Sequence, residues 1–191
     1  MAKASTASQT VGPFFNFGLT ADTKLGRLAR DGAKGERIRL SFRIVDGEGA
    51  PTPGDAMIEL WQADARGKYD HPEDARAMAP DPNFCGFGRL ETGPDGTCVF
   101  ETVKPGRVPG ADGSPQAPHI NINVFARGLL KQLPTRVYFA GERGNDEDAV
   151  LGLVPAARRD TLMARPVPGQ PGAWHIEIRL QGAGETVFFD V

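Results

Sequence analysis

Several features are scarce in this chain of 191 residues, and each shortage excludes a class of protein. No apolar run approaches the roughly 18 residues of a membrane-spanning helix. Lys and Arg (22) nearly balance Asp and Glu (24), so the formal net charge of -2 gives no reason to expect nucleic acid or an anionic membrane as a partner. The N-terminus, MAKASTASQT, lacks the apolar stretch of a secretory signal, and we therefore expect a cytoplasmic protein.

Cysteine is limited to Cys85 and Cys98. Two cysteines are too few for a disulfide scaffold, and their spacing matches no zinc motif. We expect both thiols to be reduced rather than joined in a bridge. The glycine-rich signatures GxGxxG and Walker A are also absent, so the sequence predicts no nucleotide cofactor.

Histidine occurs only at His71, His119 and His175, and tyrosine only at Tyr69 and Tyr138. A zinc site built on histidine needs three or four ligands, and these three histidines are widely separated in the sequence. We expect His175 to be an ordinary strand residue and His71, in the segment HPED, to be a turn residue. No Ser–His–Asp or Cys–His arrangement has support in the sequence.

Glycine and proline, in contrast, make up about a fifth of the chain, which disfavours a helical bundle and suits short strands joined by turns. Strict alternation predicts a half-buried strand over residues 37–46, with Ile38, Leu40, Phe42 and Ile44 on its apolar face. Further strands are predicted over residues 56–64, 119–127 and 135–141, hairpins over 88–103 and 173–191, and helices within 145–164.

We therefore predict one mainly β domain, a single β-sandwich, over residues 37–191, preceded by an N-terminal arm over residues 1–36. The arm is expected to be extended and then to form a short helix or loop over residues 25–30. Its segment GPFFNFGL (12–19) carries three phenylalanines that should not lie in water. The arm therefore packs either on its own domain or on a partner chain. The long loop over residues 65–88 is expected to be functional or interfacial.

The segment APHININV (117–124) places His119 and Asn121 on one face of a predicted strand, because residues i and i+2 of a strand point the same way. His-x-His on a strand would offer two metal ligands, and here the second position is an amide. The opposite face of the strand is apolar.

Three segments occur in a fixed order: WQADARGKY (61–69), FCGFGRLETGPDGTCVFETVKPG (84–106) and APHININV. Together they resemble the intradiol ring-cleavage dioxygenases, specifically the protocatechuate 3,4-dioxygenase group. The resemblance runs from SQTVGPFF (8–15) to GAGETVFFDV (182–191). It implies a β-sandwich of the intradiol dioxygenase type, with long loops and one or two short helices.

Catalytic chains of this family hold a non-haem ferric ion with two tyrosines and two histidines. The corresponding positions here are Tyr69, Val108 in KPGRVP, His119 and Asn121. Valine offers no lone pair, and an asparagine carbonyl is a neutral and much weaker ligand. The resemblance therefore implies a degenerate iron site, with no metal and no catalytic residue in this chain.

In the protocatechuate 3,4-dioxygenase group, an iron-bearing β chain is accompanied by a homologous α chain without iron. APHINI and KPGRVP are similar to the α chain, which implies an iron-bearing β partner in a larger oligomer of αβ pairs, acting on protocatechuate (3,4-dihydroxybenzoate) and O₂. The resemblance also implies that Thr10, Gly12, Pro13 and Arg127 bind substrate at the partner's active site. Taken without the resemblance, Arg127 is more simply a surface residue in a weak salt bridge.

Two alternatives stay open at this point. The chain is a self-sufficient dioxygenase that recruits a substitute ligand such as His71, or it is a β-sandwich binding or carrier module with no oxygenase role.

Overall fold

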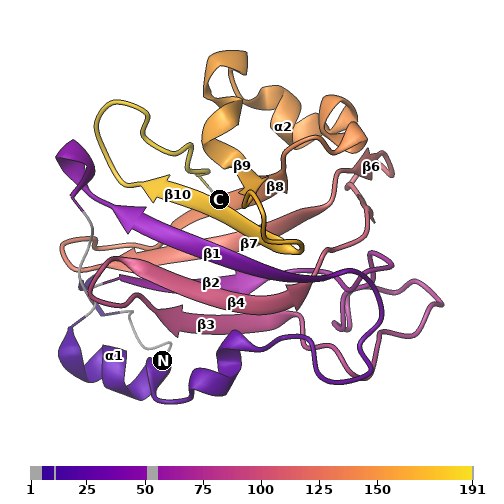
Figure 1. The fold of residues 1–191 in the computed structure, drawn as a ribbon, viewed down its shortest axis with the longest axis horizontal. Coiled ribbons are helices and arrows are strands. Elements are labelled where there is room, and N and C mark those ends of the chain that lie inside the picture. Colours follow the sequence, from indigo (N-terminus) through magenta and orange to yellow (C-terminus); the bar gives the residue numbers. More distant parts are fainter. Residues whose placement is uncertain (1–5, 11, 51–55, 191) are drawn as a thin grey trace, which may run out of the picture.

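Strand β1 (Arg37–Val45) shows how the sequence pattern sets the fold in the computed structural model (Figure 1). The side chains of Ile38, Leu40, Phe42 and Ile44 are all buried, as the alternation predicts. The residues that alternate with them, Arg37, Arg39, Ser41 and Arg43, are exposed or half-buried. The structure describes residues 6–10, 12–50 and 56–190.

The eight main strands form one sheet that folds over on itself and nearly closes, in the order β3-β2-β7-β8-β9-β10-β1-β4. One layer contains β4, β1 and β10, the other contains β3, β2, β7 and β8, and β9 joins them (Figure 1). The prediction of a mainly β, sandwich-like domain is confirmed. The bounds are β2 (Ala56–Trp61), β3 (Phe87–Glu91), β4 (Thr97–Val103), β7 (His119–Ala126), β8 (Leu133–Phe139), β9 (Met163–Pro166) and β10 (Ala173–Arg179).

Apolar side chains from both layers meet in one core between them. Phe42 of β1 and Phe100 of β4 pack edge to face, with ring centroids 5.7 Å apart. From the other layer, β7 contributes Ile120, Ile122 and Val124, each nearly inaccessible to solvent. Burial of these side chains from water is the main stabilising contribution to the fold. It also fixes which face of β7 points outward.

Both predicted hairpins are wrong, although each contains real strands. Strands β3 and β4 follow one another through a tight turn in which the Gly93 amide donates to the Thr97 carbonyl. They then diverge: β3 pairs with β2, whereas β4 pairs with β1 in the other layer. At the C-terminus, residues 187–190 form no strand, and the Phe189 amide donates to the Pro134 carbonyl near the start of β8. Alternation predicts a strand but does not identify its neighbour.

The helical segments are shorter than predicted. Residues 145–164 contain parts of 3₁₀ helices η3 (Arg143–Glu147) and η4 (Ala156–Leu162), a single α-helical segment, α2 (Ala149–Leu153), and the start of β9. Pro155 separates α2 from η4, because proline lacks the amide that would continue a helix. Two further 3₁₀ helices are η1 (Thr23–Gly26) and η2 (Gly47–Gly49), and a short ladder joins β5 (Val108–Pro109) to β6 (Pro115–Gln116).

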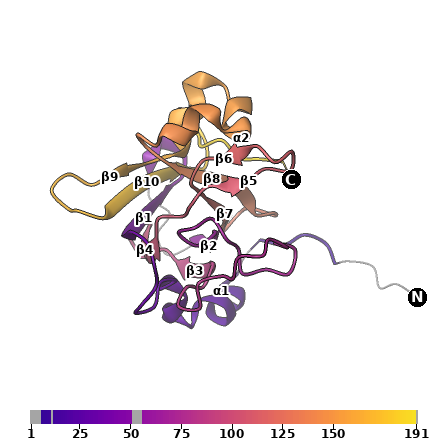
Figure 2. The ribbon, with the colours of Figure 1, turned by 90° about the vertical axis from the view of Figure 1, so that its right-hand side faces the viewer.

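The N-terminal arm is not extended over its phenylalanine-rich segment, contrary to the prediction. Residues Pro13–Thr20 form helix α1, with Pro13 in its first turn, a favourable position for proline. Helix α1 lies beside β3 at one end of the molecule, and α2 lies at the other (Figures 1 and 2). The side chain of Phe17 is 70% exposed in this single chain. Whether the arm packs on a partner chain stays a prediction.

Candidate functional site

The outer face of β7 and β8 carries a group of polar side chains. The antiparallel register places His119 opposite Tyr138 and Asn121 opposite Arg136. Because side chains alternate along a strand, all four project from the face opposite the Ile120 and Ile122 core positions. Two of these positions, His119 and Asn121, belong to the degenerate iron site predicted from the sequence.

The loop between β2 and β3 brings Tyr69 to this face, and buried carboxylates hold the loop in shape. Asp64 accepts hydrogen bonds from the backbone amides of Arg66 (2.8 Å) and Lys68 (3.0 Å) through one oxygen. Its other oxygen accepts one from the Asp81 amide at 3.2 Å. One carboxylate therefore connects two distant parts of the loop.

Asp74 anchors the loop at Tyr69 itself, where its carboxylate accepts the Tyr69 amide at 2.9 Å. The Lys68 ammonium lies 3.0 Å from the same carboxylate, and the Lys68 and Asp74 side chains are only 4% and 8% exposed. Arg76 donates to Asp74 as well, at 2.7 Å through Nε. The Arg76 hydrogen bonds are the main reason why the pKa of Asp74 is held far below its ordinary value. This ion cluster fixes the backbone from which Tyr69 projects.

The Tyr69 ring stacks on Trp61, with centroids 5.8 Å apart and an angle of 11° between the planes. Burial raises the pKa of Tyr69, against smaller opposing effects of the Arg136 charge and the Asn121 side chain. The group is therefore a neutral phenol at physiological pH. Two of the four degenerate ligand positions, Tyr69 and Asn121, thus lie close together.

His119 is 3% exposed, and its Nδ1 lies 2.8 Å from the Ala117 carbonyl. A carbonyl only accepts, so Nδ1 carries the proton and Nε2 has the free lone pair. Burial, with a further contribution from the charge of Arg136, lowers the pKa of His119 to about 4. The imidazole is therefore neutral near pH 7, and its ring centroid lies 5.8 Å from that of Tyr138.

Val108, the fourth predicted position, is buried in β5 and lines a hollow of about 620 Å³ together with Trp61, Tyr69 and His71. The structure thus brings all four predicted positions to one region. His71 is an exposed turn residue, as predicted, and its Nδ1 accepts the Glu73 amide at 3.3 Å. Within residues 6–10, 12–50 and 56–190, no group of three His, Cys, Asp or Glu side chains is arranged to hold a metal ion.

The donor chemistry at these positions does not fit a ferric ion. Fe³⁺ favours anionic oxygen, and of the four positions only Tyr69 could supply it, by losing its proton to a bound metal. Val108 has no donor atom, and the Asn121 amide oxygen is a neutral and much weaker ligand. Tyr69 and His119 are therefore the only two of the four positions that keep an ordinary ligand atom.

The predicted substrate-binding residues lie at the other end of β7. The Thr10 hydroxyl accepts the Gly128 amide at 2.7 Å and donates to the Ala126 carbonyl at 3.4 Å, so it bridges the two residues that flank Arg127. Arg127 itself is exposed, just after the strand. Gly12 and Pro13 begin helix α1. The structure therefore joins Thr10 to the Arg127 turn, and the substrate-binding role of the four residues stays a prediction.

Three members of the polar cluster were not predicted as site residues: the half-buried Arg136 and the buried Tyr138 and Asp148. Arg136 and Tyr138 alternate with apolar residues in TRVYF, and this i, i+2 spacing was the available signal for a second polar strand face. Asp148 accepts the Tyr138 hydroxyl at 3.2 Å, the Ala117 amide at 2.8 Å and two amides of α2. Nothing in the local sequence indicated that Asp148 would reach Ala117.

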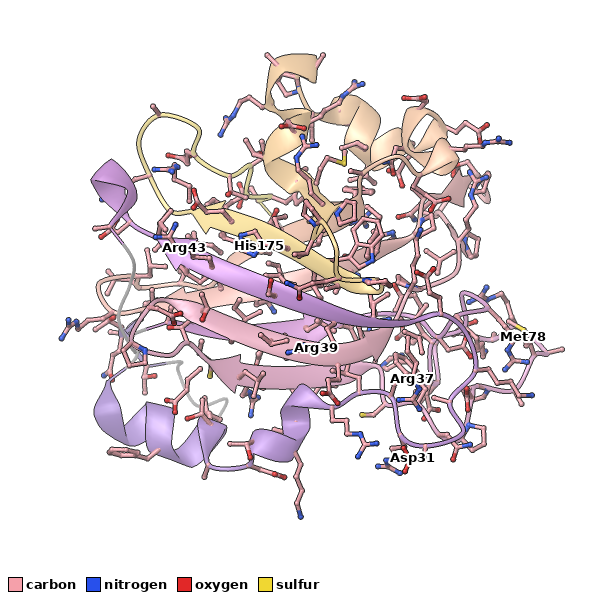
Figure 3. The ribbon with its side chains drawn as sticks, viewed as in Figure 1. Asp31, Arg37, Arg39, Arg43, Met78 and His175 are labelled. Atoms are coloured by element: carbon pink, nitrogen blue, oxygen red, sulfur yellow. The ribbon has the colours of Figure 1, made fainter. Side chains whose placement is uncertain are left out.

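The remaining candidates lie elsewhere. His175 is a strand residue in β10, as predicted, and its Nδ1 lies 2.9 Å from the Ser41 hydroxyl of β1. Figure 3 shows it on the layer of β1 and β10, near Arg43. Cys85 and Cys98 are both free thiols, which confirms that prediction, and burial raises the pKa of Cys98 to about 12. No helix of the described residues is long and apolar enough to cross a membrane.

Comparison with known proteins places these features in context. A family model described as Dioxygenase matches residues 10–181. The chain is 44% identical to the protocatechuate 3,4-dioxygenase alpha chain of Burkholderia cepacia, over 97% of each chain. It is also 44% identical to the Pseudomonas putida alpha chain, over 97% of this chain and 96% of the relative.

Less similar relatives are also dioxygenases. The Burkholderia cepacia protocatechuate 3,4-dioxygenase beta chain is 37% identical over 69% of this chain and 56% of its own length. Among solved structures, the dioxygenase domain of a dioxygenase carbohydrate-binding protein fusion from Streptomyces sp. SirexAA-E aligns with a TM-score of 0.62 and 26% identity. The alignment covers 83% of this chain and 88% of that one.

Proposed function

This chain belongs to the intradiol ring-cleavage dioxygenase family, and from that premise we propose that it is the non-catalytic, iron-free α chain of a protocatechuate 3,4-dioxygenase. The observation that carries the proposal is the 44% identity to α chains over nearly the full length of both proteins. The match to the β chain covers less of this chain, at lower identity.

The ligand positions support the same assignment. The family's tyrosine and histidine positions are occupied here by Tyr69, Val108, His119 and Asn121, of which only Tyr69 and His119 keep an ordinary ligand atom. We therefore expect the iron to be held by a homologous β chain. The self-sufficient alternative needs a substitute ligand such as His71, which lies in an exposed turn, where its Nδ1 accepts a backbone amide.

The assembled enzyme would insert both oxygen atoms of O₂ between the two hydroxyl-bearing carbons of 3,4-dihydroxybenzoate, giving 3-carboxy-cis,cis-muconate in the β-ketoadipate route of aromatic catabolism. A ferric ion in the β chain would bind the substrate's two hydroxyl oxygens and activate the ring. This chain would shape the pocket, exclude water and hold the β chain in αβ pairs.

Within that role, the arm and the turn after β7 are the parts that would reach the substrate. Thr10 fastens the arm to the backbone on both sides of Arg127, so the arm and Arg127 form one surface. A guanidinium is well matched to the carboxylate of protocatechuate, because it can donate two parallel hydrogen bonds. Gly12 and Pro13 would complete the wall by setting the direction in which α1 leaves the arm.

The proposal is tested by expressing the chain alone and together with an iron-bearing β-type homologue, then measuring iron per chain and ring cleavage of protocatechuate. We expect a colourless, iron-free chain in isolation and an iron-containing, active complex that co-purifies. A red-brown isolated chain with stoichiometric iron would contradict the iron-free role. Failure to form a stable complex with an iron-bearing homologue would favour a binding or carrier module.

A further inference from the structure

Arg136 lies beside the degenerate iron site, although it is not one of its ligand positions. It stands directly opposite Asn121 in the β7–β8 ladder. With Asn121 it lines a groove of about 430 Å³ along the outer face of the sheet. Arg136 therefore brings a permanent positive charge to the face that carries the remaining ligand-type side chains.

The guanidinium is held in place by bonds on the same face. Its Nη1 donates to the Gln116 side-chain oxygen at 2.7 Å and lies 3.5 Å from the Tyr138 hydroxyl. Tyr138 donates in turn to buried Asp148, which is capped by backbone amides. Because Gln116 and Tyr138 are both fixed in ladders, the charge cannot swing away without breaking these bonds.

The two surviving ligand types both lie within the electrostatic influence of this charge. The positive charge of Arg136 acts on the Tyr69 phenol and on the His119 imidazole. A positive charge favours the phenolate of a tyrosine, but here desolvation dominates and the group stays a phenol. A ferric ion placed between Tyr69 and His119 would lie near the guanidinium, and like charges repel.

We infer that Arg136 is the resident cation of this site: its guanidinium takes the electrostatic place of a metal ion and excludes ferric iron independently of the two missing ligands. The inference rests on the proposed function and deepens it. The absence of Tyr at position 108 and of His at position 121 weakens the binding of iron. The fixed positive charge of Arg136 would repel a ferric ion even if those two ligands were restored. Restoring the ligands alone should then fail.

The inference is tested by restoring the ligand types with Val108→Tyr and Asn121→His, and then adding a change at Arg136. Arg136→Gln removes the charge and keeps a hydrogen-bonding side chain, whereas Arg136→Lys keeps the charge and serves as the matched control. Each purified chain is titrated with ferric iron under a weak competing chelator. Bound metal is measured by elemental analysis and by the visible absorption of a ferric tyrosinate.

We expect the double variant to bind iron weakly, and Arg136→Gln in that background to raise its affinity at least about tenfold, the lower end of the effect of altering groups around a metal. Arg136→Lys should leave the affinity as weak as in the double variant. Equal affinity in the Gln and Lys forms, or strong binding by the double variant itself, would overturn the inference. Arg136→Met, a second neutral form, is titrated in parallel so that a folding defect of one neutral variant does not decide the result.

The iron content of the unmodified chain distinguishes a failure of this inference from a failure of the proposed function. Stoichiometric iron in the unmodified chain would contradict the iron-free role. An iron-free unmodified chain whose ligand-restored form gains nothing from Arg136→Gln would overturn only the role of Arg136.

Discussion

The side chain of Asn121 lies close enough to the hydroxyl of Tyr69 to lower the pKa of this phenol, against the larger, opposite effect of burial. Both residues belong to the degenerate iron site predicted from the sequence. Tyr69 comes from the loop after β2, and Asn121 comes from the middle of β7. The loop and the sheet therefore meet at these two side chains.

A double-mutant cycle measures the interaction between the side chains of Tyr69 and Asn121. Tyr69→Phe and Asn121→Ala should each lower the free energy of unfolding, and the coupling between them should be about 1 kcal/mol, typical of one net hydrogen bond. Urea denaturation of the two single variants and the double variant gives the coupling. Strictly additive effects would show that the two side chains do not interact.

Thr10 should slow amide hydrogen exchange in the turn that contains Arg127. Its hydroxyl accepts the Gly128 amide at 2.7 Å, so Thr10→Val removes that acceptor while keeping the side chain's shape. We expect exchange of the Gly128 amide hydrogen to accelerate roughly fivefold, as for loss of about 1 kcal/mol of protection. Thr10→Ser, the matched control, keeps the hydroxyl and should leave exchange nearly unchanged. Equal rates in the Val and Ser variants would argue against this tie.

Arg127→Ala should impair the assembled enzyme without affecting its metal. A charge-assisted hydrogen bond to a carboxylated substrate contributes about 1.5–3 kcal/mol, so we expect KM for protocatechuate to rise by at least about tenfold. Iron content should not change, because the proposed function places the iron in the partner chain and not in the chain that carries Arg127. Lys131→Ala removes an exposed cation nearby and is the control. Lost iron with an unchanged KM would contradict a substrate-binding role.

Asp74→Asn should destabilise the loop that positions Tyr69. The change leaves the nearly inaccessible Lys68 ammonium without its carboxylate, and breaking such a buried pair costs about 3 kcal/mol. Asp70→Asn alters an exposed carboxylate of the same loop and should have little effect. Urea denaturation at neutral pH compares the two variants.

The lowered pKa of Asp74 also predicts that the free energy of unfolding depends on pH. Its folded pKa is held well below the ordinary value of 3.8, mainly by the Arg76 hydrogen bonds. Below pH 3.8 the unfolded carboxyl therefore takes up protons that the folded one does not. The stability that Asp74 contributes is fully present above that pH and is lost as pH falls toward the folded pKa. The variant Asp74→Asn should show a shallower loss of stability in acid, and an equally steep loss would refute this.

Asp148→Ala should be among the most damaging substitutions outside the apolar core. Asp148 is 2% exposed and binds the Tyr138 hydroxyl, the Ala117 amide and the first turn of α2. Losing these bonds should lower the free energy of unfolding by about 3 kcal/mol or more. The neighbouring Asp146 is exposed, so Asp146→Ala provides the comparison by thermal or urea denaturation. Similar effects of both changes would contradict the structural role of Asp148.

Strand positions were predictable from the sequence because alternation reports burial of one face, as at Ile38, Leu40 and Phe42. Strand partners were not, because alternation is the same whichever strand lies alongside. The turn before Thr97 predicts a hairpin equally well whether β4 pairs with β3 or crosses to β1. Likewise, ETVFFDV has strand-forming residues, but its backbone groups find partners at Arg179 and Pro134 rather than in a ladder.

For the site, the sequence by itself determined the identities that matter: Val108 has no donor atom, and Asn121 is an amide, whatever the fold. Only the tertiary structure decided what surrounds them. It placed Asn121 close to Tyr69, joined Thr10 to the turn at Arg127 by hydrogen bonds, and set the charge of Arg136 opposite Asn121. The chemistry of a side chain is local and can be read from the sequence. Its hydrogen-bond partners and its electrostatic surroundings depend on segments distant in the chain, and those meet only when the core is packed.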